Sequence, residues 1–335
     1  MKKLKAAVIG LGVGAKHAQI YNLDNKVDLV TLCDFNQKKL DFYKKKFPKC
    51  SFTNDENVVF RDPTIDIVSI ASYDNFHFRH ILKAIKYKKN FFVEKPFCLK
   101  FSELNRIISK LRKNKNLVFS SNLVLRTMPI FLDLKNKIKR NIFGKVYYCE
   151  GDYNYGRINK ILNGWRGKIS SYSVTLGGGI HLIDLIVSLI GLKVTKVVAE
   201  GNNISTKNSK FKNLDLVSAF LRFDNGLIVK ISSNFGSVTT HHHILKIYGT
   251  KCSFFYDNFK AKYIKSRKPV KDKFINCNYS DIQKSKVLKS FIKSVYYKKN
   301  KNIVSQKEII NLMYVCFAIE KSLKTKKWEK VNYKN

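Results

Sequence analysis

Residues 4–120 alternate short apolar runs with amphipathic segments. Runs of strand length cover 4–10, 27–33, 65–71, 91–93 and 117–120. Segments of helical period lie between them, at 14–23, 36–47, 74–88 and 101–114. This alternation predicts an N-terminal α/β domain with a parallel, doubly wound sheet, because each strand–helix–strand unit returns the chain to the same sheet edge.

Beyond residue 122 the pattern changes to strands that follow one another closely. Strand-like segments cover 145–155, 194–205, 214–223, 227–234 and 243–248. The sequence Asp-Asn-Gly at 224–226 is a strong hairpin signal between two of them. With one conspicuous helix at 179–190, this pattern predicts a C-terminal α+β domain built on an open, mostly antiparallel sheet.

The chain of 335 residues is long enough for two domains. We expect a dinucleotide-binding domain over 1–122 and a substrate-binding domain over 123–335. An amphipathic segment at 305–324 predicts a last helix that packs back on the N-terminal domain. A lysine-rich, poorly patterned stretch around 260–273 predicts a mobile loop.

The formal net charge is +40, which can indicate a nucleic-acid or membrane partner. Here the charge is spread along the chain, is carried mostly by lysine and accompanies no nucleic-acid-binding motif. We therefore expect neither partner, and the charge instead favours an anionic small substrate. The seven cysteines show no C-x-x-C spacing, and the apolar stretch at 180–192 is too short to span a bilayer. Both features fit a soluble protein of the reduced cytoplasm.

A glycine-rich turn, GLGVGA at 10–15, separates the first strand from the first helix. This is the context that a dinucleotide fingerprint requires, since glycines let the backbone approach a pyrophosphate and the helix start receives its charge. We predict cofactor contacts from Gly10, Gly12, Val13, Gly14 and Ala15. Either Ala15 or Gly14 fills the third small position of the fingerprint. The alternative is a tight turn without a ligand.

Asp34 ends the second strand, roughly 20 residues after the glycine turn. A carboxylate there can bond both ribose hydroxyls of an adenosine, and it repels a 2′-phosphate. We therefore predict NAD in preference to NADP, a preference that Lys38 or Lys39 would soften. The structural alternative is a turn or helix-capping aspartate.

The segment SIASYDNFH at 69–77 leaves another strand at the same sheet edge and enters a helix. Ser72 and His77 are therefore candidates to line the cofactor. A histidine in the first turn of a helix also commonly holds a loop through its ring nitrogens, so both interpretations of His77 stay open.

The apolar run at 91–93 leads directly into Glu94-Lys95-Pro96. Ligands of open α/β sheets bind at the carboxyl ends of the strands, so Lys95 is a candidate to meet the reactive end of the cofactor. Glu94 is a candidate to bind the nicotinamide-side ribose. Partial burial can lower a lysine pKa from about 10.4 toward roughly 7–8, where it takes up a proton efficiently. A cationic Lys95 would instead polarise a carbonyl or hold an alcohol.

A second cluster, LGGGIHLID, covers 176–184. Its glycines allow close approach of another group, and His181 lies in the first turn of the helix that they open. Asp184 follows at i+3 on the same face, where it can orient the imidazole, and it is a candidate to bind the substrate. His181 is therefore a candidate general acid or base. The alternative is a bonded His–Asp pair that ties the helix down.

Aromatic and cationic residues interleave at 152–157 and 164–168. Arg157, Trp165 and Arg166 suit stacking on a sugar or base and bidentate recognition of a phosphate, although they also suit a protein interface. The three histidines at 241–243 suggest a metal, but a strand sends neighbouring side chains to opposite faces. We expect no metal site there.

These motifs, taken in order from the glycine turn to the Gly-Gly-Gly-x-His-x-x-Asp segment, resemble the glucose-fructose oxidoreductase/inositol dehydrogenase/MocA (Gfo/Idh/MocA) family over nearly the full chain. The resemblance implies an N-terminal Rossmann domain, a C-terminal open sheet used in oligomerisation, and a homodimer or homotetramer. It also implies nicotinamide-dependent oxidation or reduction of sugars and related polyols. Carried onto this sequence, it assigns Lys95 a position near the nicotinamide and His181 the role of the second-domain histidine.

The sequence departs from the family pattern in two places. The glycine loop is one residue short before His17, and the aspartate frequently found four residues before the catalytic histidine is Gly177. The resemblance therefore leaves Lys95 and His181 as the minimal pair of catalytic residues. The segment from Tyr153 to Gly167 resembles members associated with surface-polysaccharide and nucleotide-sugar pathways.

The sequence thus predicts an NAD-dependent oxidoreductase that transfers a hydride between nicotinamide and a hydroxyl-bearing carbon of a sugar or nucleotide sugar. All candidate residues fall at strand ends or helix starts consistent with one crevice. The alternative is a non-catalytic protein that senses a dinucleotide and a sugar, which Gly177 in place of aspartate keeps open. A redox-neutral reaction with transient oxidation is a further variant.

Overall fold

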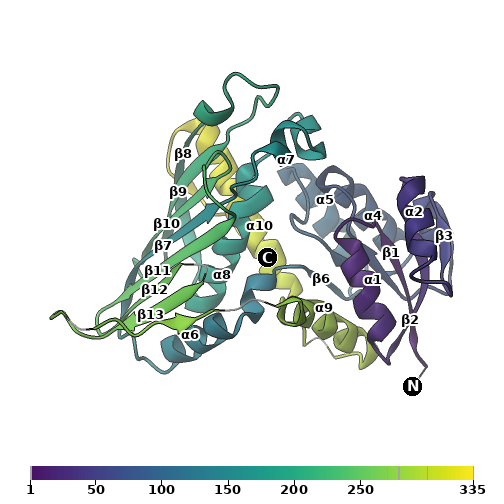
Figure 1. The fold of residues 1–335 in the computed structure, drawn as a ribbon, viewed down its shortest axis with the longest axis horizontal. Helices are drawn as coiled ribbons and strands as arrows, with labels where there is room; N and C mark the ends of the chain where they lie inside the picture. Colours follow the sequence, from purple (N-terminus) through teal and green to yellow (C-terminus); the bar gives the residue numbers. More distant parts are fainter. Residues whose placement is uncertain (1, 258, 270, 278–279, 300, 335) are drawn as a thin grey trace. The chain divides into compact units, whose positions relative to one another are not determined.

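The computed structural model describes residues 2–257, 259–269, 271–277, 280–299 and 301–334, which form two compact units (Figure 1). Unit 1 comprises Met1–Val124 and Ser285–Ile310, and unit 2 comprises Leu125–Lys284 and Asn311–Asn335. The chain passes between the units three times, first at the start of the 3-10 turn η2 (Val124–Thr127) and then within two helices, α9 (Asp281–Tyr296) and α10 (Gln306–Thr325).

Unit 1 contains a six-stranded sheet in the order β3-β2-β1-β4-β5-β6, in which all neighbours are parallel. Its strands are β1 (Leu4–Ile9), β2 (Val27–Cys33), β3 (Ser51–Thr53), β4 (Ile67–Ile70), β5 (Asn90–Val93) and β6 (Phe119–Ser121). Its other helices are α1 (Gly14–Leu23), α2 (Gln37–Lys44), α3 (Glu56–Arg61), α4 (His77–Lys86) and α5 (Phe101–Arg112), with a 3-10 turn η1 (Asp74–Phe76) before α4. The predicted doubly wound sheet is confirmed, with the strand order of a dinucleotide-binding fold.

The core of unit 1 lies on both faces of this sheet, because successive side chains of a strand point to opposite sides. On one face, the Phe92 ring of β5 contacts His17 of α1 at 5.3 Å and Phe291 of α9 at 5.7 Å. On the other face, Phe91 stacks on Phe119 of β6 at 5.1 Å. Helices α1 and α9 therefore cover the same face, and this packing brings a C-terminal segment into unit 1.

Unit 2 contains a nine-stranded sheet in the order β14-β13-β12-β11-β7-β10-β9-β8-β15. Its strands are β7 (Val146–Asn154), β8 (Val194–Asn202), β9 (Leu216–Phe223), β10 (Ile228–Asn234), β11 (His242–Gly249), β12 (Ser253–Asp257), β13 (Lys260–Ile264), β14 (Ile275–Asn276) and β15 (Glu329–Lys330). The β7–β10 pair is parallel and the other pairs are antiparallel. The predicted mostly antiparallel sheet is thus confirmed.

The helices of unit 2 are α6 (Pro129–Lys139), α7 (Asn159–Leu162) and α8 (Ile180–Ile190) with the unit's part of α10. Short helical turns are η2 (Val124–Thr127), η3 (Trp165–Lys168), η4 (Thr175–Gly179) and η5 (Ile204–Thr206), of which η4 is π-helical. Helices α8 and α10 lie along one face of the sheet (Figure 1). Gly151 of β7 has no side chain, which makes room for Leu182 and Ile186 of α8.

Several local predictions can be compared with this fold. Strands β9 and β10 form the predicted hairpin, with Gly226 at φ +86° in the turn. The predicted mobile loop at 260–273 is wrong in its first part, where β13 pairs with β12 through residues 260–264. The strand signal of Lys260 to Ile264 is weak because the segment has only five residues and two of them are lysines. Among the described residues, no helix is both long and apolar enough to cross a membrane.

Candidate active site

The glycine turn between β1 and α1 has room for a ligand on one side and tight packing on the other. Gly10 adopts φ +92°, and a Cβ there would lie 2.6 Å from the carbonyl carbon of Ala71, so only glycine fits. A Cβ at Gly12 would meet nothing within 4 Å. At Gly14 it would lie 2.9 Å from Val8 Cγ1 and Ala71 Cβ. Gly14, rather than Ala15, therefore provides the close helix–strand packing of the third small position.

Asp34 lies at the carboxyl end of β2, buried beside this turn. Its Oδ2 accepts a hydrogen bond from the Leu11 N–H at 2.7 Å, and its Oδ1 accepts one from the Asn36 N–H at 2.9 Å. Lys39 Nζ lies 3.4 Å from Oδ2. The cap of α2 is Asn36, whose side chain accepts from the Lys39 N–H. Asp34 is therefore not the helix cap, and its carboxylate ties the glycine turn to the end of β2.

These residues fit a dinucleotide. Helix α1 begins at Gly14, its N-cap residue Val13 offers no side-chain acceptor, and a Cβ at Gly12 would meet no atom within 4 Å, so a ligand can approach the start of the helix. Helix starts of this kind bind phosphate through those N–H groups and the helix dipole. The carboxylate of Asp34 is fixed on the neighbouring strand, where an adenosine ribose lies in such folds.

His77 has a structural position in unit 1. The side chain is fully buried, its Nδ1 lies 2.6 Å from Pro96 O, and its Nε2 lies 3.1 Å from Ser72 O. The ring thus joins the loop after β4 to the segment after β5. Of the two interpretations of His77, this geometry favours the structural one.

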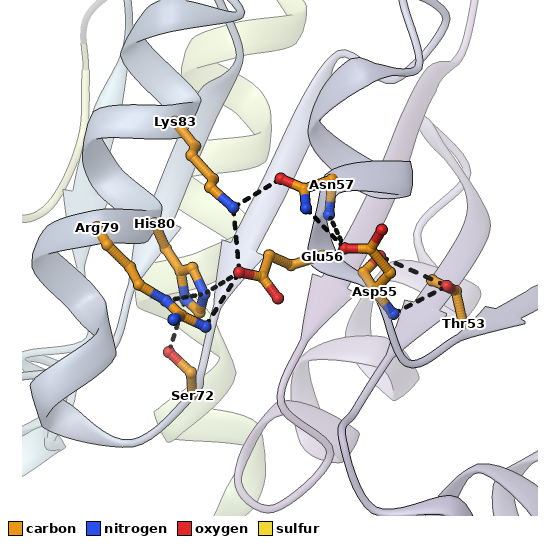
Figure 2. Close-up of polar contacts among 8 residues, drawn as sticks. All are labelled: Thr53, Asp55, Glu56, Asn57, Ser72, Arg79, His80 and Lys83. Carbon is orange, nitrogen blue, oxygen red and sulfur yellow. Dashed lines mark hydrogen bonds and ion pairs between the residues drawn. The ribbon is translucent and has the colours of Figure 1, made fainter.

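The Ser72 side chain belongs to a polar cluster that joins α3 to α4 (Figure 2). Its hydroxyl lies 2.9 Å from Nδ1 of His80, and His80 lies 3.8 Å from Glu56. Glu56 also binds Arg79 at 3.0 Å and Lys83 at 3.1 Å. Burial, and then the positive charge of Arg79, lowers the pKa of His80 to about 3 against the opposing effect of Glu56. A neutral imidazole therefore holds the Ser72 hydroxyl.

Glu94 and Lys95 follow β5 at the sheet edge that carries the glycine turn. Glu94 Oε1 accepts a 2.6 Å hydrogen bond from Asn122 and lies 3.2 Å from His17 Nε2. Burial alone would raise the pKa of Glu94, but the bonds from His17 and Asn122, with the charge of Lys95, outweigh burial and lower it. Glu94 is thus an ionised, anchored side chain directly beside Lys95.

The backbone around Lys95 is fixed on both sides. The Glu94 N–H donates to Ile70 O at 2.9 Å, and Pro96 O contacts His77. The Lys95–Pro96 peptide bond is cis. The hydrogen bonds of Glu94 N–H and Pro96 O hold the strand end that carries the Lys95 side chain, which is the kind of support that a catalytic or binding group requires.

In unit 2, the glycine triplet packs three different groups against the start of α8. A Cβ at Gly177 would overlap the Tyr172 hydroxyl, one at Gly178 would overlap the Tyr153 ring, and one at Gly179 would overlap the Ser233 hydroxyl. The expected close approach is therefore made by side chains of the same unit. His181, in the first turn of α8, stacks on Tyr153 with 6.3 Å between ring centres.

Asp184 has a strong partner on the buried side of α8. Its carboxylate receives a bidentate pair from Arg126, with Nε–Oδ2 at 2.8 Å and Nη2–Oδ1 at 2.6 Å, and both side chains are almost completely buried. Such a pair fixes a helix firmly, because losing one member leaves a buried charge. This geometry favours a structural role for Asp184 over a contact with substrate.

The cationic and aromatic side chains after β7 gather near Tyr153. Arg157 lies 5.9 Å from the Tyr155 ring, and Arg166 lies 4.4 Å from the Trp165 ring. Partial burial, followed by the charges of Arg157 and Arg166, lowers the pKa of Lys160. Three cations therefore lie close enough to repel one another, an arrangement that an anion would relieve.

Sequence reasoning missed several residues of these clusters. Asn122 and His17 hold Glu94, Arg126 holds Asp184, and Tyr172 faces Gly177. The only sequence signal among them was His17, which follows the glycine turn. His243 of β11 and His241, which directly precedes that strand, contact the Tyr153 ring with 5.0 and 5.2 Å between ring centres. In the part of the chain that the structure describes, no group of three or more His, Cys, Asp or Glu side chains could hold a metal ion.

Comparison with known proteins identifies both halves of the chain. Residues 4–122 match the family model described as "Oxidoreductase family, NAD-binding Rossmann fold", and residues 131–255 match the GFO/IDH/MocA C-terminal domain. Myo-inositol 2-dehydrogenase of Thermotoga maritima is 24% identical over 267 residues, which cover 77% of this chain and 76% of the relative. The NAD(+)-dependent scyllo-inositol 2-dehydrogenase of Bacillus subtilis is 24% identical over 270 residues, 78% of this chain and 76% of the relative.

A solved structure, myo-inositol 2-dehydrogenase from Lactobacillus plantarum, shares the fold with a TM-score of 0.82. It is 19% identical, and the match covers 99% of this chain and 100% of that one. The two domain matches together span more than half of the sequence. The chain therefore belongs to the Gfo/Idh/MocA family of oxidoreductases, and its N-terminal domain binds NAD.

Proposed function

We propose that this chain is a dehydrogenase that oxidises a CH–OH group of a cyclic polyol or sugar with NAD. The observation that carries the proposal is Lys95, on a rigid strand end at the sheet edge that also carries the glycine turn and Asp34. NAD, when held by the glycine turn and Asp34, would supply the hydride acceptor for oxidation or the hydride donor for reduction. The two inositol dehydrogenases among the relatives support a polyhydroxylated ring as substrate.

Lys95 and His181 have complementary roles in this proposal. The Lys95 ammonium holds and polarises the reacting hydroxyl, and it stabilises the negative charge that develops on oxygen as the hydride leaves. His181 takes up the hydroxyl proton on oxidation and returns it on reduction. Glu94, kept ionised by His17 and Asn122, favours the cationic form of Lys95.

We further propose that the natural substrate is an anionic sugar, such as a nucleotide sugar used in surface-polysaccharide biosynthesis. Support comes from the cluster of Arg157, Lys160 and Arg166 beside Trp165, since guanidinium groups bind phosphate and the indole can stack on a ring. We also propose a homodimer or homotetramer formed through the face of the second sheet that bears the stacked rings of Tyr148 and Tyr248.

The test is a cofactor-reduction screen at 340 nm with NAD and with NADP. The panel contains UDP-sugars, free sugars, inositols and sugar acids. We expect turnover with NAD and at least one cyclic polyol or sugar, and higher kcat/KM for an anionic sugar than for its neutral counterpart. Bound NAD without turnover of any of these compounds would contradict the proposal. Product analysis separates net oxidation from a redox-neutral reaction.

A further inference from the structure

The phenol of Tyr172 occupies the space where a side chain at residue 177 would begin. A Cβ built on Gly177 would overlap the Tyr172 hydroxyl and lie 2.7 Å from its Cζ. Tyr172 is 4% exposed, so this contact is made inside unit 2. Because residue 177 is glycine, the Tyr172 hydroxyl can lie directly against the helical segment that leads into α8.

The spacing of residues 177 and 181 indicates that this hydroxyl lies on the side of the helix that carries His181. Residues four apart on a helix are neighbours on one face, with roughly 5–6 Å between their Cβ atoms. Gly177 precedes His181 by four positions, where the π-helical turn η4 continues directly into α8. The Tyr153 ring lies against the intervening Gly178 and stacks on His181.

The Tyr172 ring is held rigidly before any ligand binds. It makes edge contacts with Phe211 and Phe235, both at 6.2 Å between ring centres. The next residue, Ser173, donates to Glu320 at 2.6 Å and accepts from the Leu176 N–H at 3.0 Å. A hydroxyl fixed in this way is preorganised, because no conformational entropy is lost to position it when the reaction begins.

We propose that the Tyr172 hydroxyl is a positioning group for His181, in the place that a side chain at residue 177 would otherwise take. A phenol both donates and accepts hydrogen bonds and is neutral at neutral pH, with a reference pKa of about 10. It can therefore fix the ring orientation and tautomer of the imidazole without adding a negative charge. A carboxylate at residue 177 would add that charge and favour the imidazolium.

The inference rests on the proposed function in one respect, that His181 takes part in proton transfer. The physical coupling of Tyr172 to His181 can be measured without turnover. Other titratable or charged groups near this part of the unit include Glu320, which accepts from Ser173, and the Arg126–Asp184 pair on the buried side of α8. Tyr153, which stacks on His181, also contacts His241 and His243 and interacts electrostatically with Arg157 and Arg166. A test must therefore change Tyr172 alone.

The experiment compares imidazole nitrogen spectra of the full chain, labelled at histidine, as the pH is varied. The His181→Gln variant assigns the His181 signals. Tyr172→Phe keeps the ring and removes only the hydroxyl. We expect a changed tautomer ratio for His181 and a titration midpoint displaced by about half a pH unit or more. Tyr256→Phe, a buried tyrosine on β12 that packs on Phe131, is the matched control and leaves His181 unchanged.

A second probe protects the test against misfolding. Replacing Tyr172 with 3-fluorotyrosine keeps the shape of the side chain but makes the phenol more acidic, so the His181 signals should move while the melting temperature does not. Unchanged His181 tautomer and titration in this protein and in folded Tyr172→Phe would overturn the inference. In turnover assays we expect Tyr172→Phe to lower kcat about tenfold at nearly constant KM.

Failure of the proposed function gives a different result. If His181→Gln retains full turnover, His181 is not the proton-transfer group, whatever the spectra show. If His181→Gln loses turnover while Tyr172→Phe alters neither the spectra nor kcat, the proposed function stands and the role of Tyr172 does not.

Discussion

At the scale of single residues, the chemistry of unit 1 depends on charges that the backbone holds in place. The carboxylate of Asp34 is bound by two N–H groups from different segments, and that of Glu94 by an amide and an imidazole. Both lie where a parallel sheet exposes the ends of its strands. Their positions are therefore set before a cofactor arrives, and substitutions should change affinity and selectivity in predictable directions.

Asp34→Asn should weaken NADH binding about tenfold and narrow the preference for NADH over NADPH. The amide loses the charge that repels a 2′-phosphate, and its NH2 group cannot accept from both Leu11 and Asn36. Fluorescence titration with both reduced cofactors measures the effect. Lys39→Met is the matched control, since removing the cation 3.4 Å from Asp34 should strengthen discrimination against NADPH. A parent-like selectivity in Asp34→Asn would contradict the assignment.

Lys95→Met should lower kcat by about 100-fold to 10,000-fold while the protein still binds NADH. Methionine keeps most of the length of the side chain but cannot donate to the reacting oxygen or take up a proton. The measurement pairs steady-state kinetics on the best substrate of the screen with NADH fluorescence titration. Lys100→Met, an exposed lysine five residues further on, serves as control. Near-normal turnover in Lys95→Met with NAD bound would rule out the proposed mechanism.

At the scale of elements, the sequence predicts the doubly wound sheet well because the apolar runs of its strands and the amphipathic period of its helices are both strong. The strand at Val27–Cys33 and the helix at Gly14–Leu23 agree with the structure at both ends. Helix α9 was missed because its apolar positions are spread among many lysines, and its main contact, Phe291 on Phe92, joins distant parts of the chain. Long-range packing of this kind leaves no local signal.

The same distinction applies to the candidate site. Lys95, Asp34 and His181 could be proposed as site residues from the sequence because each follows a recognisable strand end or opens a helix. Tyr172 and Arg126 could not, since their importance lies in contacts with Gly177 and Asp184, from which local sequence patterns give no orientation. The sequence shows that residue 177 has no side chain, but only the fold shows that the Tyr172 hydroxyl occupies the space.

The link between α3 and α4 should make the stability of the protein sensitive to acid. His80 has a folded pKa of about 3, against about 6.5 in an unfolded chain, because burial and the charges of Arg79, His77 and Lys83 outweigh Glu56. Below pH 6.5 the unfolded state binds a proton that the folded state does not. Stability from this group is therefore complete above pH 6.5 and is lost as the pH falls toward 3.

Melting temperatures measured from pH 7.5 to pH 4.5 test this prediction. His80→Gln keeps a hydrogen-bonding side chain beside Ser72 but cannot titrate, so its melting temperature should fall less steeply with acid than that of the parent. His242→Gln on β11, outside this cluster, should retain the parent slope. An equally steep decline in His80→Gln would show that other groups determine the acid sensitivity.

At the scale of the whole molecule, the net charge of +40 is the property that the fold explains least. Most of the lysines lie on the surface, where single ion pairs such as Lys3–Asp28 contribute little to stability. A long-range field of this size acts instead on approaching ligands, because it raises the local concentration of anions. In the function proposed above, this field favours the binding of an anionic substrate, and added salt should weaken that effect.

Raising the salt concentration from about 0.1 M to 1 M shortens the screening length from about 10 Å to about 3 Å. Binding of UDP, the anionic part of a UDP-sugar, should weaken about tenfold or more over this range, whereas the KM for neutral myo-inositol should change little.

Arg166→Gln should lose part of the UDP affinity at low salt, since it removes a guanidinium from the cationic cluster beside Trp165. Lys168→Gln, an exposed lysine on the same turn, lowers the net charge equally and separates local contact from the general field. If both variants weaken UDP binding equally, the field alone attracts anions and the cluster has no specific role. If salt affects UDP and myo-inositol alike, the substrate is not selected by charge.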